Sequence, residues 1–239
     1  MTKLKCTNSF QWLGLRNYSE VASLQKQLVP QIAGHKSMMI LGAEFFPVMT
    51  LGVRGKISED LFLSEQELHL RAIEVVQTDR GGQATIHSPG QLIIYPMLDL
   101  KVHQIGIREF VPKLMKVTLK TLQELGVDAM YSSTEPGIYT SNGKLGFCGL
   151  KSDHGVIRHG LSINIKNDLG LFQGVRSCGH KQPHLDQVCR YHPIEPAQFF
   201  DQWCHHFQQD FHLSALESVG MNDGSHLPCD LSSVGRVLA

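Results

Sequence analysis

The segment from Asp79 to Pro96, with the sequence DRGGQATIHSPGQLIIYP, constrains the fold of this 239-residue chain more strongly than any other stretch. It begins with an arginine and two adjacent glycines and ends in an apolar run that is typical of a strand. Two adjacent glycines indicate main-chain dihedral angles that other residues avoid, or a main chain that another group approaches closely. We therefore expect a single bend between two strands, made by Arg80, Gly81, Gly82, His87, Pro89 and Gly90.

Helical and strand-like patterns follow each other along the chain without strict alternation. Apolar residues at helical spacing predict long helices over residues 17–32, 107–126 and 195–211, and a short helix begins at Ser64. Asn142 and Gly143 are the strongest short signal for a hairpin, which we expect over residues 137–151. The other strand-like runs lie at residues 37–46, 47–55, 72–79, 91–100, 127–131 and 159–168. The mixture predicts an α+β fold, with helices packed on a mixed, mostly antiparallel sheet.

Length and composition limit the class of protein. A chain of 239 residues with 42% hydrophobic and 18% charged residues can bury a proper core. We expect a single domain over residues 1–217 and a C-terminal tail over residues 218–239. Lys plus Arg and Asp plus Glu both number 22, so no excess of positive charge points to nucleic acid or to an anionic membrane.

The sequence also predicts the compartment and the state of the thiols. No apolar run is long enough to span a bilayer, and the start MTKLKCTNSFQWLGL lacks the apolar core of a signal peptide. We therefore expect a cytoplasmic protein whose six cysteines are free thiols. His180 and His184 have the spacing of zinc ligands on a helix, but Pro183 between them argues against that helix, and we expect no metal site.

Two residues are candidates for chemistry on local grounds alone. Cys178 is flanked by Arg176, His180 and Lys181, and such cations lower the pKa of a thiol and favour the nucleophilic thiolate. Lys144 follows the predicted hairpin turn. On these grounds alone, an incidental loop cysteine and a solvated lysine at a hairpin end are the commoner cases, and both interpretations stay open. The glycine-rich segment matches neither GxxxxGK[ST] nor GxGxxG, so no nucleotide cofactor is indicated.

The glycine-rich segment, read as RGGQATIHSPGQLIIYP, resembles the signature of the lipoyl(octanoyl) transferase family. Three further segments, FFPVMTLGVRGK, PGIYTSNGKLGFCGLK and RHGLSINIKNDLGLFQGVRSCG, are similar to family segments in the same order and at about the same spacing. Together they run from about Trp12 to Val188. The resemblance implies a fold shared with biotin and lipoate protein ligases. The chain departs from the family pattern at Ile86, Cys148, Ser162 and Ser177, where an aromatic residue, an aliphatic residue, alanine and proline are common.

The resemblance also implies an activity, with Cys178 and Lys144 as the catalytic pair. An octanoyl group would move from octanoyl-acyl carrier protein, through a thioester on Cys178, to a lysine of a lipoyl domain. The acceptors implied are the E2 subunits of 2-oxoacid dehydrogenases and the glycine cleavage H protein, and no cofactor is needed. The binding residues implied by the family segments are Arg80, Gly81, Gly82, Gln83, Ala84, Thr85, Ile86, His87, Phe147, Cys148, Gly149, Gly160, Leu161 and Ser162.

Several alternatives stay open at this point. Arg80 and His87 either donate hydrogen bonds near the thioester carbonyl or only brace the loop. Ile93, Phe147 and Leu161 either line a tunnel for the eight-carbon chain or belong to the core. For the whole protein the alternatives are an ATP-dependent lipoate or octanoate ligase, a non-catalytic paralogue that binds lipoyl domains or carrier protein, and a thioesterase.

Overall fold

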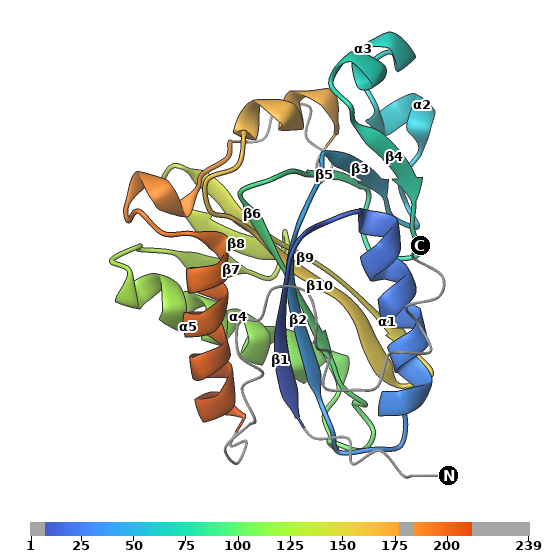
Figure 1. Ribbon diagram of the computed structural model, residues 1–239. Helices are drawn as coiled ribbons and strands as arrows, with labels where there is room; N and C mark the ends of the chain where they lie inside the picture. Colours follow the sequence, from blue (N-terminus) through green and yellow to red (C-terminus); the bar gives the residue numbers. More distant parts are fainter. Residues whose placement is uncertain (1–7, 177–183, 212–239) are drawn as a thin grey trace.

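The computed structural model describes residues 8–176 and 184–211 of the chain (Figure 1). Within these ranges, seven strands form one large sheet in the order β1-β2-β6-β10-β9-β8-β7. These strands are β1 (Ser9–Arg16), β2 (Met39–Phe45), β6 (Gln91–Met97), β7 (Met130–Ser132), β8 (Gly137–Thr140), β9 (Gly143–Asp153) and β10 (Val156–Asn164). Within this sheet β1 and β2 run parallel, and all other neighbours are antiparallel. The predicted α+β fold with a mixed, mostly antiparallel sheet is confirmed.

A smaller sheet lies at one end of the large one, together with two short helices, α2 and α3 (Figure 1). Its strand order in the described residues is β4-β3-β5, with β3 parallel to β4 and antiparallel to β5. The Ser64 side chain accepts a hydrogen bond from the main chain of Glu67 and so caps α3 where the sequence predicts it. These elements are β3 (Val48–Leu51), β4 (Glu74–Gln77), β5 (Ala84–His87), α2 (Ile57–Asp60) and α3 (Glu65–Leu70).

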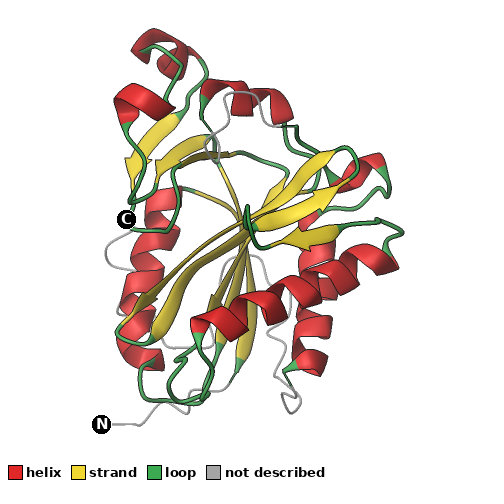
Figure 2. Cartoon of the chain, turned by 180° about the vertical axis from the view of Figure 1, so that it is seen from behind, coloured by secondary structure: helices red, strands yellow, loops and turns green. Residues whose placement is uncertain are grey.

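The long helices cover the two faces of the large sheet (Figures 1 and 2). α1 (Tyr18–Ile32) packs on one face, and α4 (Ile107–Glu124) and α5 (Pro196–Asp210) pack on the other. Side chains alternate between the two faces along a strand, so Leu41 of β2 contacts the α1 side and Ile40 the α4–α5 side. This burial on both faces explains why β2 and β6 are almost continuously apolar.

The structure differs from the sequence-based expectation around the two glycines. The prediction of a single bend is wrong, because β5 stands between the bend at Arg80–Gly82 and a second turn at Pro89 and Gly90. Thr85 and Ile86 pair with Thr50 and Met49 of β3, and their β-branched side chains suit a strand.

The remaining elements complete the comparison with the sequence. β1 and α2 were not predicted, whereas α1, α4 and α5 lie where helical spacing placed them. Between β10 and α5 the described residues form two short 3-10 helices, η1 (Leu169–Gly174) and η2 (Val188–Arg190). The expected tail over residues 218–239 lies outside the described residues. In the part of the chain that is described, no helix combines the length and the apolar composition needed to cross a membrane.

The contact between α4 and α5 provides a test of the core. Trp203 donates a hydrogen bond from Nε1 to Oγ1 of Thr118 at 2.9 Å, and both residues are fully buried. Thr118→Val leaves the indole N–H without this acceptor, which should lower the free energy of unfolding by about 1–3 kcal/mol. Thr121→Val is the matched control, because the hydroxyl of Thr121 is equally buried but bonds only to Val117 of its own helix. Urea denaturation that gave equal losses for both variants would contradict this account.

Candidate functional site

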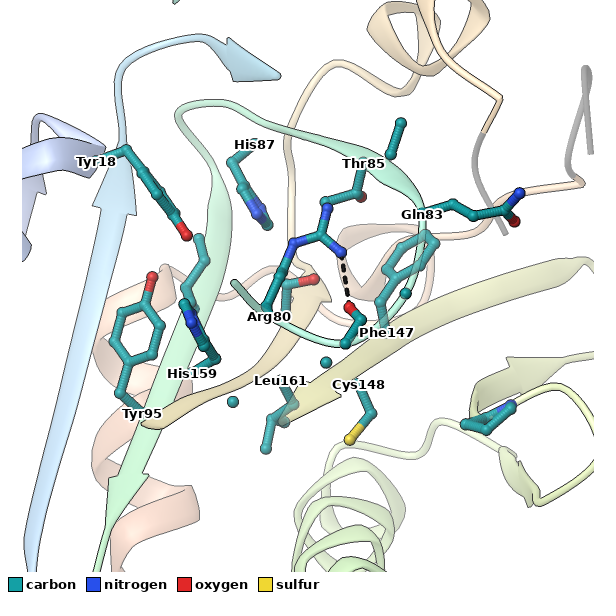
Figure 3. A pocket seen from close by; sticks show the side chains of 18 residues that line it. Tyr18, Arg80, Gln83, Thr85, His87, Tyr95, Phe147, Cys148, His159 and Leu161 are labelled. Atoms are coloured by element: carbon teal, nitrogen blue, oxygen red, sulfur yellow. Dashed lines mark hydrogen bonds between the residues drawn. The ribbon is translucent and has the colours of Figure 1, made fainter. Parts of the chain in front are cut away.

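A pocket lies between the Arg80–Gly82 bend and the strands β6, β9 and β10 (Figure 3). All the predicted binding residues line it except Ile86. Residues alternate along β5, so Thr85 and His87 face the pocket while Ile86 is buried in the apolar cluster that contains Met49 and Phe172. Ile93, Phe147 and Leu161, the predicted tunnel residues, are all in the lining.

Gly160 of β10 is a glycine because the main chain of β6 approaches it closely. A Cβ atom on Gly160 would lie 1.7 Å from the carbonyl oxygen of Ile94 in β6, so no side chain fits at this position. Gly160 pairs with Gly149 of β9, which brings two glycines side by side in the pocket wall. Much of this wall is therefore main chain rather than side chain.

The Arg80–Gly82 bend is held by the chain that follows β3. The main-chain N–H groups of Gly52, Val53 and Arg54 donate to the carbonyl oxygens of Gln83, Arg80 and Gly82 at 2.9, 3.0 and 3.1 Å. Gly82 has φ +94°, a backbone conformation that residues other than glycine rarely adopt. The second glycine of the motif is therefore required by the geometry of the bend.

Arg80 braces this bend from within. Its guanidinium donates from Nε and Nη2 to Oγ1 of Thr50 at 3.1 and 2.9 Å, and from Nη2 to the carbonyl oxygen of Thr50 at 2.6 Å. Nη1 donates to the carbonyl oxygen of Gly81 at 2.9 Å. Of the two interpretations from the sequence, these bonds support bracing of the loop.

His87 lies at the buried side of the pocket. Its Nδ1 is 2.6 Å from Oε1 of Gln91, whose Nε2 donates to Oδ1 of Asn164 at 2.8 Å. Because Oε1 is then an acceptor, Nδ1 is assigned the proton, and Nε2 is an acceptor in the neutral ring. Burial lowers the pKa of His87 to about 4, so the ring is neutral near pH 7.

Lys144 is buried, which rules out the interpretation of a solvated lysine at a hairpin end. The residue is 4% exposed, and its Nζ donates to the carbonyl oxygen of Pro136 at 3.3 Å. The ammonium lies 5.0 Å from the ring centroid of Phe147 and 5.1 Å from that of Tyr139. A Cβ atom on Gly137 would lie 2.5 Å from Cε of Lys144, so the glycine leaves the space that the lysine fills. Lys144 is not itself among the lining residues, but it contacts Pro136 and Phe147, which are, so its amine lies directly behind this part of the wall.

Cys178 lies outside the described residues, as do His180 and Lys181. Main-chain hydrogen bonds hold the residues before and after this segment. Arg176 donates its main-chain N–H to Asp60 at 2.8 Å, and Lys144 donates its own to the carbonyl oxygen of His184 at 2.8 Å. Asp186 donates back to the carbonyl oxygen of Lys144 at 3.0 Å.

Four lining residues were not predicted as site residues from the sequence. They are Tyr18, Tyr95, Pro136 and His159. Tyr95 and His159 lie within segments that carry the family resemblance and could have been proposed on that ground. Tyr18 begins a distant helix, and no local signal points to it. Figure 3 shows Tyr18, Tyr95 and His159 at one end of the pocket and Thr85 and Phe147 at the other.

Burial shifts the pKa values of the ionisable side chains at this unpredicted end. Burial raises the pKa of Tyr18 to about 12 and raises that of Tyr95 well above its usual value. Burial also lowers the pKa of His159, although Asp79 opposes this effect.

Among the described residues, no three His, Cys, Asp or Glu side chains are grouped so that they could hold a metal ion.

Solved structures show the class to which this fold belongs. A bipartite lipoate protein ligase from Thermoplasma acidophilum superposes with a TM-score of 0.71 over 90% of this chain and 88% of that chain, at 11% sequence identity. At this identity the likeness concerns the fold. The chain therefore has the fold of the lipoate protein ligases, as the sequence resemblance implied.

Sequence comparisons identify the family. The family model described as the lipoyl protein ligase A/B catalytic domain matches residues 17–208. An octanoyltransferase of Legionella pneumophila (strain Lens) is 32% identical over 195 residues, which cover 80% of this chain and 94% of the relative. An octanoyltransferase of Xanthomonas euvesicatoria pv. vesicatoria (strain 85-10) is 36% identical over 176 residues, or 74% and 73% of the two chains. The chain belongs to the lipoyl protein ligase A/B family, and the predicted resemblance is confirmed.

His87 provides a test in acid. In the unfolded chain its pKa is about 6.5, whereas in the folded protein it is about 4. The unfolded state binds more protons between these values, so the free energy of unfolding should fall as the pH drops from about 6.5 to about 4, by about 3 kcal/mol from this residue. Denaturation as a function of pH should show a shallower fall for His87→Gln. The exposed His69→Gln serves as control, and equal slopes for wild type and His87→Gln would contradict the assignment.

Proposed function

We propose that this protein is an octanoyltransferase, which moves an octanoyl group from octanoyl-acyl carrier protein to a specific lysine of a lipoyl domain. The observation that carries the proposal is the buried amine of Lys144, which lies directly behind Pro136 and Phe147 of the pocket wall. A buried lysine in such a position is suited to proton transfer, because burial and neighbours tune its basicity. The curated relatives that cover most of the chain are named octanoyltransferases.

In the first proposed step, the thiolate of Cys178 attacks the carbonyl carbon of the donor thioester. A new C–S bond forms, the donor C–S bond breaks, and the carrier thiolate takes the proton that Cys178 had passed to Lys144, which leaves Lys144 neutral. One thioester replaces another, so the exchange needs no ATP and no cofactor. The ammonium of Lys144 would favour the thiolate form of Cys178.

In the second proposed step, the ε-amine of the acceptor lysine attacks the acyl carbon on Cys178. A C–N bond forms, the C–S bond breaks, and Lys144 in its neutral form takes the proton that the amine loses. That proton then passes from Lys144 to the thiolate of Cys178, which the broken C–S bond has released. The product is an amide, and the enzyme is restored.

The acyl chain is proposed to lie along the pocket with its carbonyl near Phe147 and its tail toward Tyr95. Lys144 lies over the ring of Phe147, whereas Tyr95 and Tyr18 are at the opposite end (Figure 3). Ile93 and Leu161 offer apolar contacts between these ends. Twelve of the predicted binding residues would thereby contact the acyl group or its carbonyl, while Arg80 would brace the bend and Ile86 would support the others from behind.

The remaining parts of the proposal concern partners and context. The acceptors are proposed to be the lipoyl domains of 2-oxoacid dehydrogenase E2 subunits and the glycine cleavage H protein. The related ligase of Thermoplasma acidophilum was described with its E2 lipoyl domain. We propose a cytoplasmic enzyme whose activity resides in one domain over residues 1–217, with residues 218–239 as a tail.

Intact-protein mass spectrometry tests the covalent step. Wild type mixed with octanoyl-acyl carrier protein should gain the mass of one octanoyl group, which hydroxylamine removes and an apo lipoyl domain discharges. Cys178→Ala should gain none. Cys148→Ala is the control, because Cys148 also lines the pocket but burial raises the pKa of its thiol to about 12.

The outcomes separate the alternatives. Modification of the acceptor that requires ATP and free octanoate would indicate a ligase. Octanoate release without an acceptor would indicate a thioesterase. Binding of the lipoyl domain with neither adduct nor transfer would indicate a non-catalytic paralogue, and each of these results would overturn the proposal.

Lys144→Met tests the proton transfer. The variant keeps an unbranched side chain of similar length but has no amine, so acyl transfer should slow by about a hundredfold or more. Single-turnover rates for formation and discharge of the adduct should both fall, because the amine is proposed to act in both steps. An unchanged discharge rate would contradict the role of Lys144 as the base.

A further inference from the structure

Asp79 binds three basic side chains from the opposite wall of the pocket. Its Oδ2 accepts a hydrogen bond from Nζ of Lys151 in β9 at 2.7 Å and a second from Nη2 of Arg158 in β10. Its Oδ1 is 2.7 Å from Nε2 of His159, also in β10. Burial alone would raise the pKa of Asp79, but these hydrogen bonds hold it well below the usual range, so the carboxylate stays ionised.

This carboxylate immediately precedes the Arg80–Gly82 bend. The other polar ties described above, from Arg80 and from Gly52, Val53 and Arg54, connect the bend to the small sheet. Asp79 instead connects it to β9 and β10 of the large sheet. The bonds of Asp79 thus link the two walls of the pocket.

The bend lies directly against β9. A Cβ atom on Gly149 would be 3.2 Å from the carbonyl oxygen of Gly81, and one on Gly81 would be 3.3 Å from the carbonyl oxygen of Leu150. Contacts this short are tighter than most real Cβ contacts, so a side chain at either position would push the two main chains apart by a few tenths of an ångström. Gly81 and Gly149 both line the pocket, so their contact sets the shape of its wall.

His159 carries backbone strain at the same place. It has φ +58°, which is uncommon for a residue other than glycine, and it sits in a strand. Its main-chain N–H donates to Oε1 of the buried Gln25 at 2.8 Å, and its imidazole is bonded to Asp79. Strained residues persist where surrounding contacts fix them, and they cluster at functional sites.

We propose that Asp79 is a positioning residue for acyl transfer: by binding Lys151, Arg158 and His159 it holds the Arg80–Gly82 bend on β9 and orients His159 in the pocket wall. The proposal rests on the proposed octanoyl transfer for its effect on catalysis. It adds that the wall reaches its working position through a charge behind the pocket rather than through a group that touches the substrate.

The chain offers a matched pair of variants. Arg158 is 3% exposed and is bonded to Asp79 on one side and to Oδ2 of Asp153 on the other, through Nε at 2.9 Å. Asp79→Asn and Asp153→Asn each remove one of the two carboxylates that pair with Arg158 and leave the other in place. Neither carboxylate lines the pocket, but only Asp79 adjoins the bend and bonds to Lys151 and His159, so the Asp153 variant reports the cost to stability alone.

Steady-state kinetics with octanoyl-acyl carrier protein tests the proposal. Asp79→Asn should raise KM for the donor by about tenfold or more, because the displaced wall binds the acyl group less well in ground state and transition state alike. Asp153→Asn should stay within about twofold of wild type. A purely structural role would lower the amount of active enzyme in both variants and leave KM unchanged.

An NMR measurement tests the same geometry without catalysis. Nuclear Overhauser contacts between Gly81 and Gly149 should weaken in Asp79→Asn and persist in Asp153→Asn. If wild type transferred no octanoyl group, the proposed function would fail while this readout still judged the positioning role. Retained contacts together with an unchanged KM would overturn the role of Asp79.

A second variant tests the proposal in case Asp79→Asn folds poorly. Lys151→Met removes one of the three partners and leaves the bonds of Asp79 to Arg158 and His159. It should show a smaller rise in KM in the same direction. No change in KM or in the Gly81–Gly149 contact in this variant would likewise count against the proposal.

Discussion

The close approach of β6 and β10 at Gly160 is the contact on which the pocket depends. With the carbonyl oxygen of Ile94 where a Cβ atom would be, the two strands pack main chain against main chain. This fixes β10 and, through its pairing with Gly149, also β9. The bend at Arg80–Gly82 then lies on β9, and Lys144 emerges from the same strand. Binding wall and candidate base are therefore set by one set of strand pairings.

Sequence patterns predicted the helices and most of the large sheet, because burial on both faces leaves a strong apolar signal in strands such as β2 and β6. β1 escaped prediction because it is an edge strand that is only partly buried and mixes Gln11 and Gly14 with apolar residues. β5 escaped because its four residues stand within a run of glycines and polar residues that reads as a turn. Short strands held by pairing with a distant partner leave little local trace.

The sequence predicted residues of the candidate site only where they belong to a recognisable local motif. The resemblance led to Lys144 and to the residues around Gly81–Gly82 and around the paired Gly149 and Gly160. It did not indicate that Lys144 is buried. That burial depends on Gly137, Pro136 and the segment that begins at His184, which only the fold brings together. Asp79 illustrates the same limit, since its partners Lys151, Arg158 and His159 are more than 70 residues away in the chain.

A wall made largely of main chain has an evolutionary consequence. Carbonyl and amide groups are the same whatever side chains surround them, so mutation can replace most neighbours without altering the surface that this wall presents to the pocket. Selection then acts on a few positions where only glycine fits and on the charges that hold the strands together. Relatives with about one third of their residues in common can accordingly keep one binding surface while the rest of the chain drifts.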